Sequence, residues 1–289
     1  METMQEIRRI HFSTLDSTHS WTLQELEDGG LLAPGPFPVL VTAETQTGGR
    51  GQHSRSWFSP AGCLMLSLVF RPEEWEIPFS QRPLLGIACA LAVLESCAKV
   101  LSPANADALT LHWPNDLYVQ QDSASPRKLA GILLEGHSSG IMSAGIGVNL
   151  QNSAEKAPEE LRSLLISLND LEPEWIHAPI LQSRKLFANT SIPARPSSEK
   201  NSFPEPMERF LSLLCVELGN QFSSLARDPS STIRQADDRC AQKGQQVQLQ
   251  TPNGPVSGFC SGLDPNGALL IDGRPQYSGM LHFETNAEH

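Results

Sequence analysis

Short apolar runs alternate with polar loops from Ile10 to Leu150. Five of these runs are rich in aliphatic residues: "PVLVTAE", "CLMLSLVF", "ALTLHW", "LAGILLEG" and "IMSAGIGVNL". One longer segment, about 83 to 101, carries apolar residues at three- and four-residue spacing, the period of a helix with one apolar face. The first half of the chain is therefore predicted to be a set of short strands with one long helix among them.

The second half of the chain has a different texture. Residues 158 to 188 are predicted to be helical, because "PEELRSLLISL" opens on acidic residues that suit a helix N-terminus. The stretch 188 to 206 is rich in Ser, Pro and Asn and predicts an exposed loop or insertion, followed by a second amphipathic helix. From Asp237 onward, the turn signals "PNG" and "DPNG" flank alternating runs, which predicts a small barrel-like β domain.

Charge and composition narrow the class of protein. The formal net charge is −11 and no basic run occurs, so nucleic acid is a poor partner. No stretch approaches 18 uninterrupted apolar residues, and the N-terminus lacks a secretory signal, so we expect no membrane span and a cytoplasmic location. Six cysteines without CxxC pairing predict buried free thiols and do not favour a zinc site.

A loop rich in glycine and arginine follows the strand "PVLVT". Gly48, Gly49 and Gly51 lie within four residues, and Arg50 and Arg55 flank the last of them. Clustered glycines let backbone N–H groups approach an anion, and arginine pairs bidentately with phosphate or carboxylate. A plain flexible loop explains the same residues, and no P-loop or dinucleotide fingerprint is present.

A second polar cluster, "HWPNDLYV", ends the run "ALTLH". Pro, Asn and Asp are turn formers, so one interpretation is a strand-terminating turn. The other is that Asp116 holds a magnesium ion, which prefers one or two carboxylates plus substrate phosphates. Lys128, on the rim of the next strand, would then reach toward the same phosphates. Residue spacing does not decide between these two interpretations.

Five segments, "LDSTHSW", "AETQTGGRGQHSRSWFSP", "HWPNDLYV", "RKLAGILLEG" and "GIGVNL", occur in the order in which the biotin protein ligase family has them. The chain resembles that family (biotin–acetyl-CoA-carboxylase ligase) strongly over residues 10 to 150, and "GFCSGLDPNGALLIDG" resembles its small terminal domain. The resemblance implies an α+β fold: a mixed sheet with flanking helices, similar to class II aminoacyl-tRNA synthetases, followed by an SH3-like β-barrel. The implied domains are a catalytic domain over 1–230, with a flexible insertion near 188–206, and the small domain over 236–289.

The resemblance also implies a reaction in two steps. The biotin carboxylate attacks the α-phosphate of ATP to give biotinyl-AMP, and a lysine of a biotin carboxyl carrier protein or domain then attacks the activated carbonyl. ATP and Mg²⁺ are the implied cofactors, with biotin as the substrate, and the enzyme would be a monomer or homodimer. The work of such an enzyme is mostly positioning and charge neutralisation.

Carried over by position, Ser17, Thr18 and Gln46 would hydrogen-bond the ureido ring, and Trp57 would exclude water from the intermediate. The implied biotin-binding set is Ser17, Thr18, His19, Gln46, Arg50, Gly51, Gln52, Trp57, Lys128 and Gly131. The implied ATP-binding set is Arg50, Arg55, His112, Asn115, Asp116, Lys128, Gly147 and Asn149. Lys128, Arg50 and Asp116 would be catalytic, and Asp116 would be the metal ligand.

Two positions depart from the family pattern. His112 stands where lysine is usual, and His19 stands where asparagine is usual, which puts nucleotide charge neutralisation and biotin affinity in question. The imidazole of histidine is mostly neutral at pH 7. Neighbouring phosphates would favour its protonated form, so we expect the pKa of His112 to rise when the nucleotide is bound. Only about a dozen residues precede "LDSTHSW", so we expect no helix-turn-helix and no DNA-binding role.

Two alternative functions follow from the same residues. One is a lipoate-type ligase or acyltransferase of the same fold, against which the "GRG…W" and "WPND" motifs argue. The other is a non-catalytic binder of biotin or adenylate, which the retention of Arg50, Asp116 and Lys128 disfavours.

Overall fold

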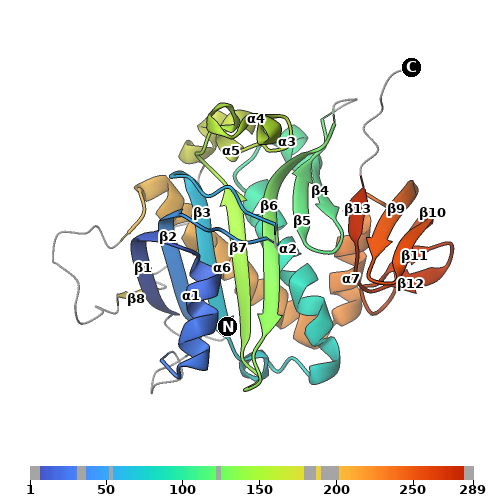
Figure 1. The fold of residues 1–289 in the computed structure, drawn as a ribbon, viewed down its shortest axis with the longest axis horizontal. Helices are drawn as coiled ribbons and strands as arrows, with labels where there is room; N and C mark the ends of the chain where they lie inside the picture. The colour runs from blue at the N-terminus through green and yellow to red at the C-terminus, as the bar shows by residue number, and fades with distance from the viewer. Residues whose placement is uncertain are drawn as a thin grey trace.

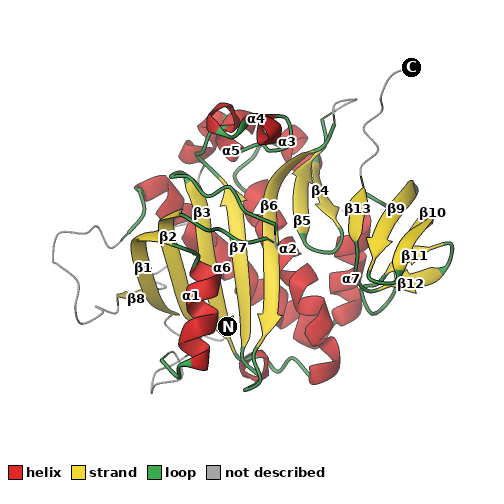
Figure 2. Cartoon of the chain, in the orientation of Figure 1, coloured by secondary structure: helices red, strands yellow, loops and turns green. Residues whose placement is uncertain are grey.

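A computed structural model describes residues 7–30, 37–51, 55–121, 125–178, 187–189 and 202–282. Within these residues the chain forms two β-sheets with helices around the larger one (Figure 1). Short strands joined by loops make up most of the first half, with the long helix near 83–101 among them, as the apolar runs predicted (Figure 2).

The larger sheet has eight strands in the order β4-β5-β6-β7-β3-β2-β1-β8. Its strands are β1 (Ile7–Leu15), β2 (Val39–Gln46), β3 (Cys63–Phe70), β4 (Leu109–His112), β5 (Asp116–Val119), β6 (Arg127–Gly136), β7 (Met142–Asn149) and β8 (Phe187–Asn189). β1 pairs with β2 and with β8 in parallel, and the remaining pairs are antiparallel, so the sheet is mixed. β3 is buried along its whole length because both faces of the sheet are covered at its centre.

Helices cover the two faces of this sheet unequally. α2 (Leu85–Ala98) and α6 (Glu205–Arg227) pack against one face and enclose the largest apolar cluster, and the 3₁₀ turns η2 (Pro72–Trp75) and η3 (Phe79–Leu84) lead into α2. The segment Phe79–Ala98 is apolar and long enough to cross a membrane, but 67% of its most apolar window is buried inside the protein. It is the core helix predicted near 83–101.

The opposite face carries one helix, α1 (Thr18–Glu27). It lies over β2, β3 and β7 and closes a smaller apolar cluster that contains Phe12, Leu26 and Val41. Figure 1 shows α1 in front of the sheet, with α2 and α6 behind it. Much of this face is therefore left open beside α1, and that opening is where the candidate site lies.

The smaller sheet has five antiparallel strands in the order β12-β11-β10-β9-β13. They are β9 (Gln246–Thr251), β10 (Gly254–Leu263), β11 (Leu269–Ile271), β12 (Arg274–Gln276) and β13 (Met280–His282). α7 (Pro229–Asp238) precedes them and follows α6 directly. The predicted small β domain at the C-terminus is thus confirmed as an antiparallel sheet, whereas the domain limits 1–230 and 236–289 stay a prediction.

The predicted helix over 158 to 188 is wrong. The described part of that stretch holds α4 (Glu159–Arg162), α5 (Leu168–Leu171), the 3₁₀ turn η5 (Pro173–His177) and the first two residues of β8. The turn η4 (Ala154–Lys156) precedes it, and α3 (Pro103–Asp107) is similarly short. Proline precedes α4 and opens η5, and a new cap at Ser167 starts α5, so each helical run ends within two turns. Between them the chain pairs with β6, where the Lys128 N–H donates to the Leu164 carbonyl at 2.7 Å.

The predicted insertion near 188–206 falls mostly outside the described residues. Its described parts are the last two residues of β8, residues 202–204 and the start of α6, which begins at Glu205.

Candidate functional site

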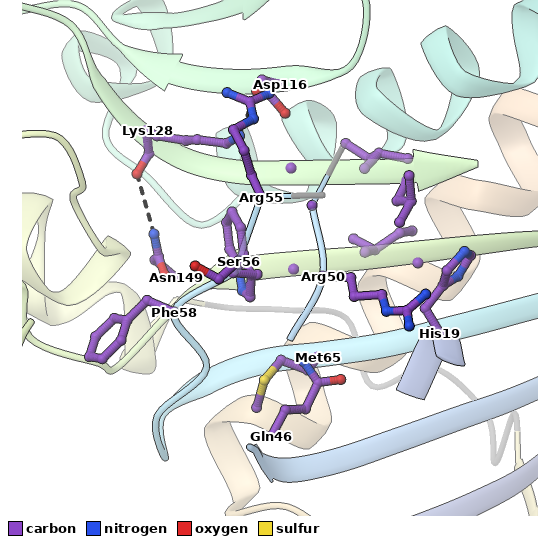
Figure 3. Close-up of a pocket in the computed structure, with 18 of the residues that line it drawn as sticks. His19, Gln46, Arg50, Arg55, Ser56, Phe58, Met65, Asp116, Lys128 and Asn149 are labelled. Atoms are coloured by element: carbon purple, nitrogen blue, oxygen red, sulfur yellow. Dashed lines mark hydrogen bonds and ion pairs between the residues drawn. The ribbon is translucent and has the colours of Figure 1, made fainter. Parts of the chain in front are cut away.

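A cavity of about 340 Å³ opens on the α1 face of the large sheet. Most of its polar lining comes from the start of α1, the ends of β2 and β7, the segment after β2, and strands β5 and β6. The lining residues are Ser17, Thr18, His19, Gln46, Arg50, Gly51, Arg55, Ser56, Trp57, Phe58, Met65, Leu66, Asp116, Tyr118, Lys128, Gly131, Ile132, Leu133, Gly145, Ile146, Gly147, Asn149, Leu161, Leu164 and Leu165. Figure 3 shows these side chains converging from segments that are far apart in the sequence.

The first turn of α1 and the end of β2 form one polar wall of the cavity, which we call the ring end (Ser17, Thr18 and Gln46). Ser17 caps α1 by accepting from the Ser20 N–H, and the Thr18 N–H donates to Gln46 Oε1 at 2.7 Å. Gln46 Nε2 donates to the hydroxyl of Ser59 at 3.1 Å. Each of these side chains is therefore fixed by a neighbour while it still has hydrogen-bonding capacity toward the cavity.

A second layer of hydroxyls supports the ring end. Ser67, on the fully buried β3, donates to the Thr18 hydroxyl at 3.1 Å, and Ser59 donates to the Trp57 carbonyl at 2.9 Å. Both serines are buried, so water competes little for their hydrogen bonds. The sequence motifs did not identify Ser59 or Ser67 as site residues. For Ser67, its position as a polar residue within the apolar run "CLMLSLVF" could have indicated such a role.

Three glycines form the floor of the cavity. A Cβ at Gly147 would lie 2.6 Å from the Trp57 indole, and one at Gly145 would lie 3.0 Å from the ring of His19. A Cβ at Gly131 would lie 3.1 Å from Asp116 Oδ1 and 3.3 Å from Lys128 Nζ. Side chains at these positions would displace the groups that line the cavity, which explains why β6 and β7 carry glycine there.

The opposite wall carries charges, and we call it the charged end (Arg55, Asp116 and Lys128). Lys128 Nζ lies 2.5 Å from Asp116 Oδ2 and 5.5 Å from the centroid of the Trp57 ring. Figure 3 shows the Arg55 side chain extending toward this pair. The side chains of Lys128 and Asp116 keep 23% and 20% of their surface exposed, so a ligand in the cavity can reach them.

The backbone of Lys128 is held on both sides. Its N–H donates to the Leu164 carbonyl, and its carbonyl accepts from the Ile166 N–H at 3.0 Å and from Asn149 Nδ2 at 3.3 Å. Asn149 thus lines the cavity and also anchors the strand that carries the lysine, as the dashed line in Figure 3 shows.

The glycine-arginine segment folds back on itself across the cavity. The Gly51 N–H donates to the Arg55 carbonyl at 2.7 Å, and the Trp57 N–H donates to the Gly49 carbonyl at 2.8 Å. Arg50 and Ser56 form an antiparallel bridge between these bonds. Gln52, a predicted ligand of biotin, lies outside the described residues.

His19 lies at the ring end and is buried. Its Nδ1 is 3.4 Å from the Ser143 hydroxyl, and its Nε2 is 3.2 Å from Glu135 Oε2. Burial lowers the pKa of His19 against the opposing influence of Glu135, and Arg50 lowers it further. Figure 3 shows the Arg50 side chain directed toward His19, so the two residues share one side of the cavity.

Two of the predicted ATP-binding residues do not line the cavity. His112 is buried behind it, with its ring stacked on Tyr118 at a centroid distance of 4.0 Å. Burial and the charge of Lys128 lower the pKa of His112 to about 3, so the imidazole is neutral at pH 7 in this structure, and its charging beside bound phosphates stays a prediction. Asn115 turns its Nδ2 to the Ile132 carbonyl instead of to the cavity.

The sequence motifs did not identify the apolar residues that line the cavity. Phe58, Met65, Leu133 and Ile146 line the cavity, and so do three leucines, Leu161, Leu164 and Leu165. Leu164 is 55% exposed although it is apolar. Alternation along β3, β6 and β7 was the available signal for the strand residues, but no pattern marks the leucines of α4 and the segment after it.

A magnesium ion fits the donor set at the charged end. Among the described residues no group of three or more His, Cys, Asp or Glu side chains gathers into a metal cluster. Asp116 is the carboxylate that lines the cavity within the described chain. A single carboxylate suits an ion that takes most of its remaining ligands from phosphates and water.

Comparison with known proteins gives a consistent picture. The profile described as "Biotin/lipoate A/B protein ligase family" matches residues 15–151. A "Biotin--[acetyl-CoA-carboxylase] ligase" of Paracoccus denitrificans is 28% identical over 264 residues, which cover 89% of this chain and 91% of that protein. The "Bifunctional ligase/repressor BirA" of Escherichia coli is 37% identical over 142 residues, which are 47% of this chain and 38% of that protein.

Solved structures agree on the fold. The structure of a biotin protein ligase from Aquifex aeolicus in complex with biotin and ATP superposes with a TM-score of 0.65 at 22% identity, and the match covers 95% of this chain and 97% of that one. The match extends through the C-terminal sheet, so the whole arrangement of the two sheets is shared.

Proposed function

Because the chain is a member of the biotin protein ligase family, we propose that it activates biotin with ATP and transfers it to a lysine of a carrier protein. One observation supports this most directly: a single cavity joins a fixed, neutral polar wall to a wall bearing Arg55, Asp116 and Lys128. A neutral cyclic urea suits the first wall, and a carboxylate meeting a triphosphate suits the second.

In the first step, a carboxylate oxygen of biotin forms a bond to the α-phosphorus of ATP, and the bond from that phosphorus to the pyrophosphate oxygen breaks. Negative charge accumulates between the two reacting groups, and Lys128, held at the cavity by its bridge to Asp116, would be the cation that stabilises it. Preformed charges of this kind stabilise the transition state without having to reorganise. Arg50 and Arg55 would orient the carboxylate and the phosphates.

In the second step, the ε-amine of the carrier lysine attacks the activated carbonyl. An amide bond forms, AMP leaves with the electron pair of the broken C–O bond, and the amine loses a proton to solvent. Biotinyl-AMP is a mixed anhydride that water would hydrolyse. Trp57, which lies over Gly147, and Leu161, Leu164 and Leu165 would keep water from it.

Asp116 would hold a magnesium ion, which when bound would neutralise phosphate charge. Asp116 also pairs with Lys128, which holds the lysine side chain at the cavity.

The wider setting of the reaction is also part of the proposal. The partner would be the biotin carboxyl carrier protein or domain of a biotin-dependent carboxylase, and the enzyme would act without nucleic acid as a monomer or homodimer. We propose a cytoplasmic location, for which the thiols give support. All six cysteines are buried and free, and burial raises the pKa of Cys63, Cys89 and Cys215 to about 12. Such thiols are poor nucleophiles and suit a reducing compartment.

The test is a reconstituted reaction with purified protein, ATP, Mg²⁺, labelled biotin and a biotin carboxyl carrier domain. We expect pyrophosphate release that depends on biotin, followed by label on the carrier lysine. The carrier with its acceptor lysine replaced by arginine is the matched control and should remain unlabelled. Label that appears with lipoate in place of biotin would favour the lipoate-type alternative. Binding of biotin without pyrophosphate release would favour a non-catalytic binder.

A further inference from the structure

The C-terminal sheet contacts the turn that carries Asp116, although it contributes no described residue to the cavity lining. The contact is made by Trp113, which is 4% exposed and lies three residues before Asp116. Its indole Nε1 donates to the Gly267 carbonyl at 2.8 Å, and its backbone N–H donates to Gln242 Oε1 at 3.0 Å. Both acceptors follow α7, so the turn is held from outside the large sheet.

The link between α7 and the small sheet runs alongside β4, the strand that leads into this turn. The Leu111 N–H donates to the Arg239 carbonyl at 2.8 Å, and the Ala241 N–H donates to the Leu111 carbonyl at 3.0 Å. Residues 239–241 therefore act as a further short strand at the edge of the large sheet. This pairing places Gln242 directly beside Trp113.

The Gly267 carbonyl is itself fixed in place. Gly267 has a φ of +81°, a backbone conformation that favours glycine, and a Cβ there would lie 2.7 Å from Leu84 and 2.9 Å from Ile87. The tip of the "DPNG" turn thus packs against the start of α2, the core helix behind the large sheet. Trp113 is consequently bonded to a group that cannot shift independently of the core.

The other side of the same turn is tied to β6. Asn115 Nδ2 donates to the Ile132 carbonyl, and the Ile132 N–H donates to the Asn115 carbonyl at 3.1 Å. Asp116 begins β5 immediately afterwards and meets Lys128 of β6. The backbone that presents Asp116 is therefore anchored at two points, Trp113 on the small sheet and Asn115 on the large one.

We propose that Trp113 is a positioning residue for the adenylation step and that the C-terminal sheet fixes the Asp116–Lys128 pair through it and through Gln242. This inference rests on the proposed function, because it concerns how the same cavity receives ATP. The ring end makes no contact with this network, so biotin binding should be independent of it. Transfer of biotin from preformed biotinyl-AMP should also be independent, because the triphosphate has already been consumed.

The test uses two substitutions in the full-length protein. Trp113→Phe keeps an aromatic ring and removes the Nε1 donor, and Gln242→Met keeps the side-chain length and removes the acceptor. For each we expect biotin-dependent pyrophosphate release, and the affinity for an ATP analogue with an α,β-methylene bridge, to fall roughly five- to tenfold, the effect of losing one neutral hydrogen bond. Biotin affinity by calorimetry and transfer to the carrier from supplied biotinyl-AMP should stay within about twofold of wild type.

Matched controls separate positioning from plain stability. Trp175→Phe changes an equally buried tryptophan whose Nε1 has no acceptor among the described residues, and Gln221→Met changes a buried glutamine of α6. Both controls should lower the melting temperature without changing the ratio of adenylation to transfer. All rates are compared at a temperature where every variant is folded.

The outcomes are distinct. Adenylation that falls while transfer and biotin affinity hold, in both variants, supports the inference. Equal losses in both half-reactions, or an adenylation rate and ATP-analogue affinity that match wild type, overturn it. If wild type itself releases no pyrophosphate, the proposed function fails and this inference with it.

Discussion

The ring end and the charged end of the cavity are built in different ways. At the ring end, Thr18 and Gln46 are held by hydrogen bonds to each other and to buried serines of β3 and the segment before it. At the charged end, Lys128 and Asp116 hold each other, and their side chains extend from neighbouring strands with about a fifth of their surface exposed. The ring end is therefore ordered by hydrogen bonds between neutral groups, whereas the charges at the other end pair with each other.

This contrast predicts that the two ends control different quantities. A preformed polar wall mainly sets the binding affinity for the ring, because its side chains are already ordered in the folded protein and lose little entropy when the ring binds. A mutually neutralised ion pair acts mainly when charge develops, so it affects the rate of the chemical step. The predictions below test this division, from the largest expected effect to the smallest.

Replacing Lys128 by alanine should have the largest effect. We expect the rate of biotinyl-AMP formation to fall by about 10³-fold, the scale for removing one preorganised group from a developing charge. The fold should persist, because the backbone bonds of residue 128 to Leu164 and Ile166 do not use its side chain. Pyrophosphate release by stopped assay measures the rate, and circular dichroism checks the fold.

The control for this substitution is Lys99→Ala, which also removes an ion-paired lysine, in this case from Glu217 on the far side of the sheet. It should leave adenylation unchanged. Adenylation by Lys128→Ala within a factor of about three of wild type would contradict the assigned role, since the loss of a preorganised charge should cost far more.

At the ring end, Thr18→Val should weaken biotin binding by about tenfold, the effect of one lost hydrogen bond of roughly 1.4 kcal/mol. The shape of the side chain is kept and only the hydroxyl, which accepts from Ser67, is removed. The rate at saturating biotin and the KM for ATP should not change. Calorimetry with biotin alone measures the affinity without requiring catalysis.

Thr14→Val is the matched control, because Thr14 pairs with Thr45 on the exposed edge of the neighbouring strands. It should bind biotin as wild type does. If the maximal rate of Thr18→Val fell while its biotin affinity stayed unchanged, the assignment of affinity to the ring end and of rate to the charged end would be wrong.

His112 belongs to neither end, and its effect should appear in stability. Its pKa in the folded protein is lowered to about 3, below the value of about 6.5 expected in the unfolded chain. Between these values the unfolded state binds the proton, so the contribution of His112 to the free energy of unfolding is full above about pH 6.5 and is lost as the pH falls toward 3. His112→Phe should flatten the acid side of the stability profile.

Urea unfolding at several pH values between about 7 and 4, the range in which the unfolded histidine titrates, measures this profile. His177→Phe, at an exposed histidine, should keep the wild-type slope. The KM for ATP of a His112 variant should stay flat with pH. A KM for ATP that worsens as the pH rises in wild type alone would restore the phosphate-contact role expected from the sequence.

The smallest expected effect concerns the glycine-arginine segment. We expect biotin and ATP together to increase the hydrogen-exchange protection of the Gly51 and Trp57 amides, because an anion would organise the arginines that flank them. The Thr18 amide, already bonded to Gln46, should gain less. Equal gains at the two positions would mean that the ends of the cavity are ordered together.

Local patterns were sufficient for most of the fold. The apolar runs appear as β2, β3, β4, β6 and β7, and the three- and four-residue spacing appears as α2, because each of these depends on which residues of a short segment are buried. The "PNG" turn joins β9 to β10 for a similar reason, since its geometry is set by its own residues. The segment 158 to 188 failed because proline positions and pairing with β6 outweighed its helical periodicity.

The sequence predicted the site residues less completely than it predicted the strands. Ser17, Thr18, Gln46, Arg50, Asp116 and Lys128 were named by their motifs, and all of them line the cavity. His112 and Asn115 share a motif with Asp116 but face away from the cavity. Side chains alternate along a strand and turn with the backbone, so adjacency in a motif does not place two residues in one site.

By itself, the sequence determined the resemblance to the biotin protein ligase family, most strands of the large sheet with its core helix, and the polar and charged residues available for the chemistry. Tertiary structure alone decided which of those residues share one cavity and what holds them there. Trp113 is bonded to Gln242 and Gly267, which lie 129 and 154 residues away along the chain. The burial that lowers the pKa of His112 likewise depends on the strands that pack around it. No local pattern records such contacts, because they exist only once the two sheets have packed against each other.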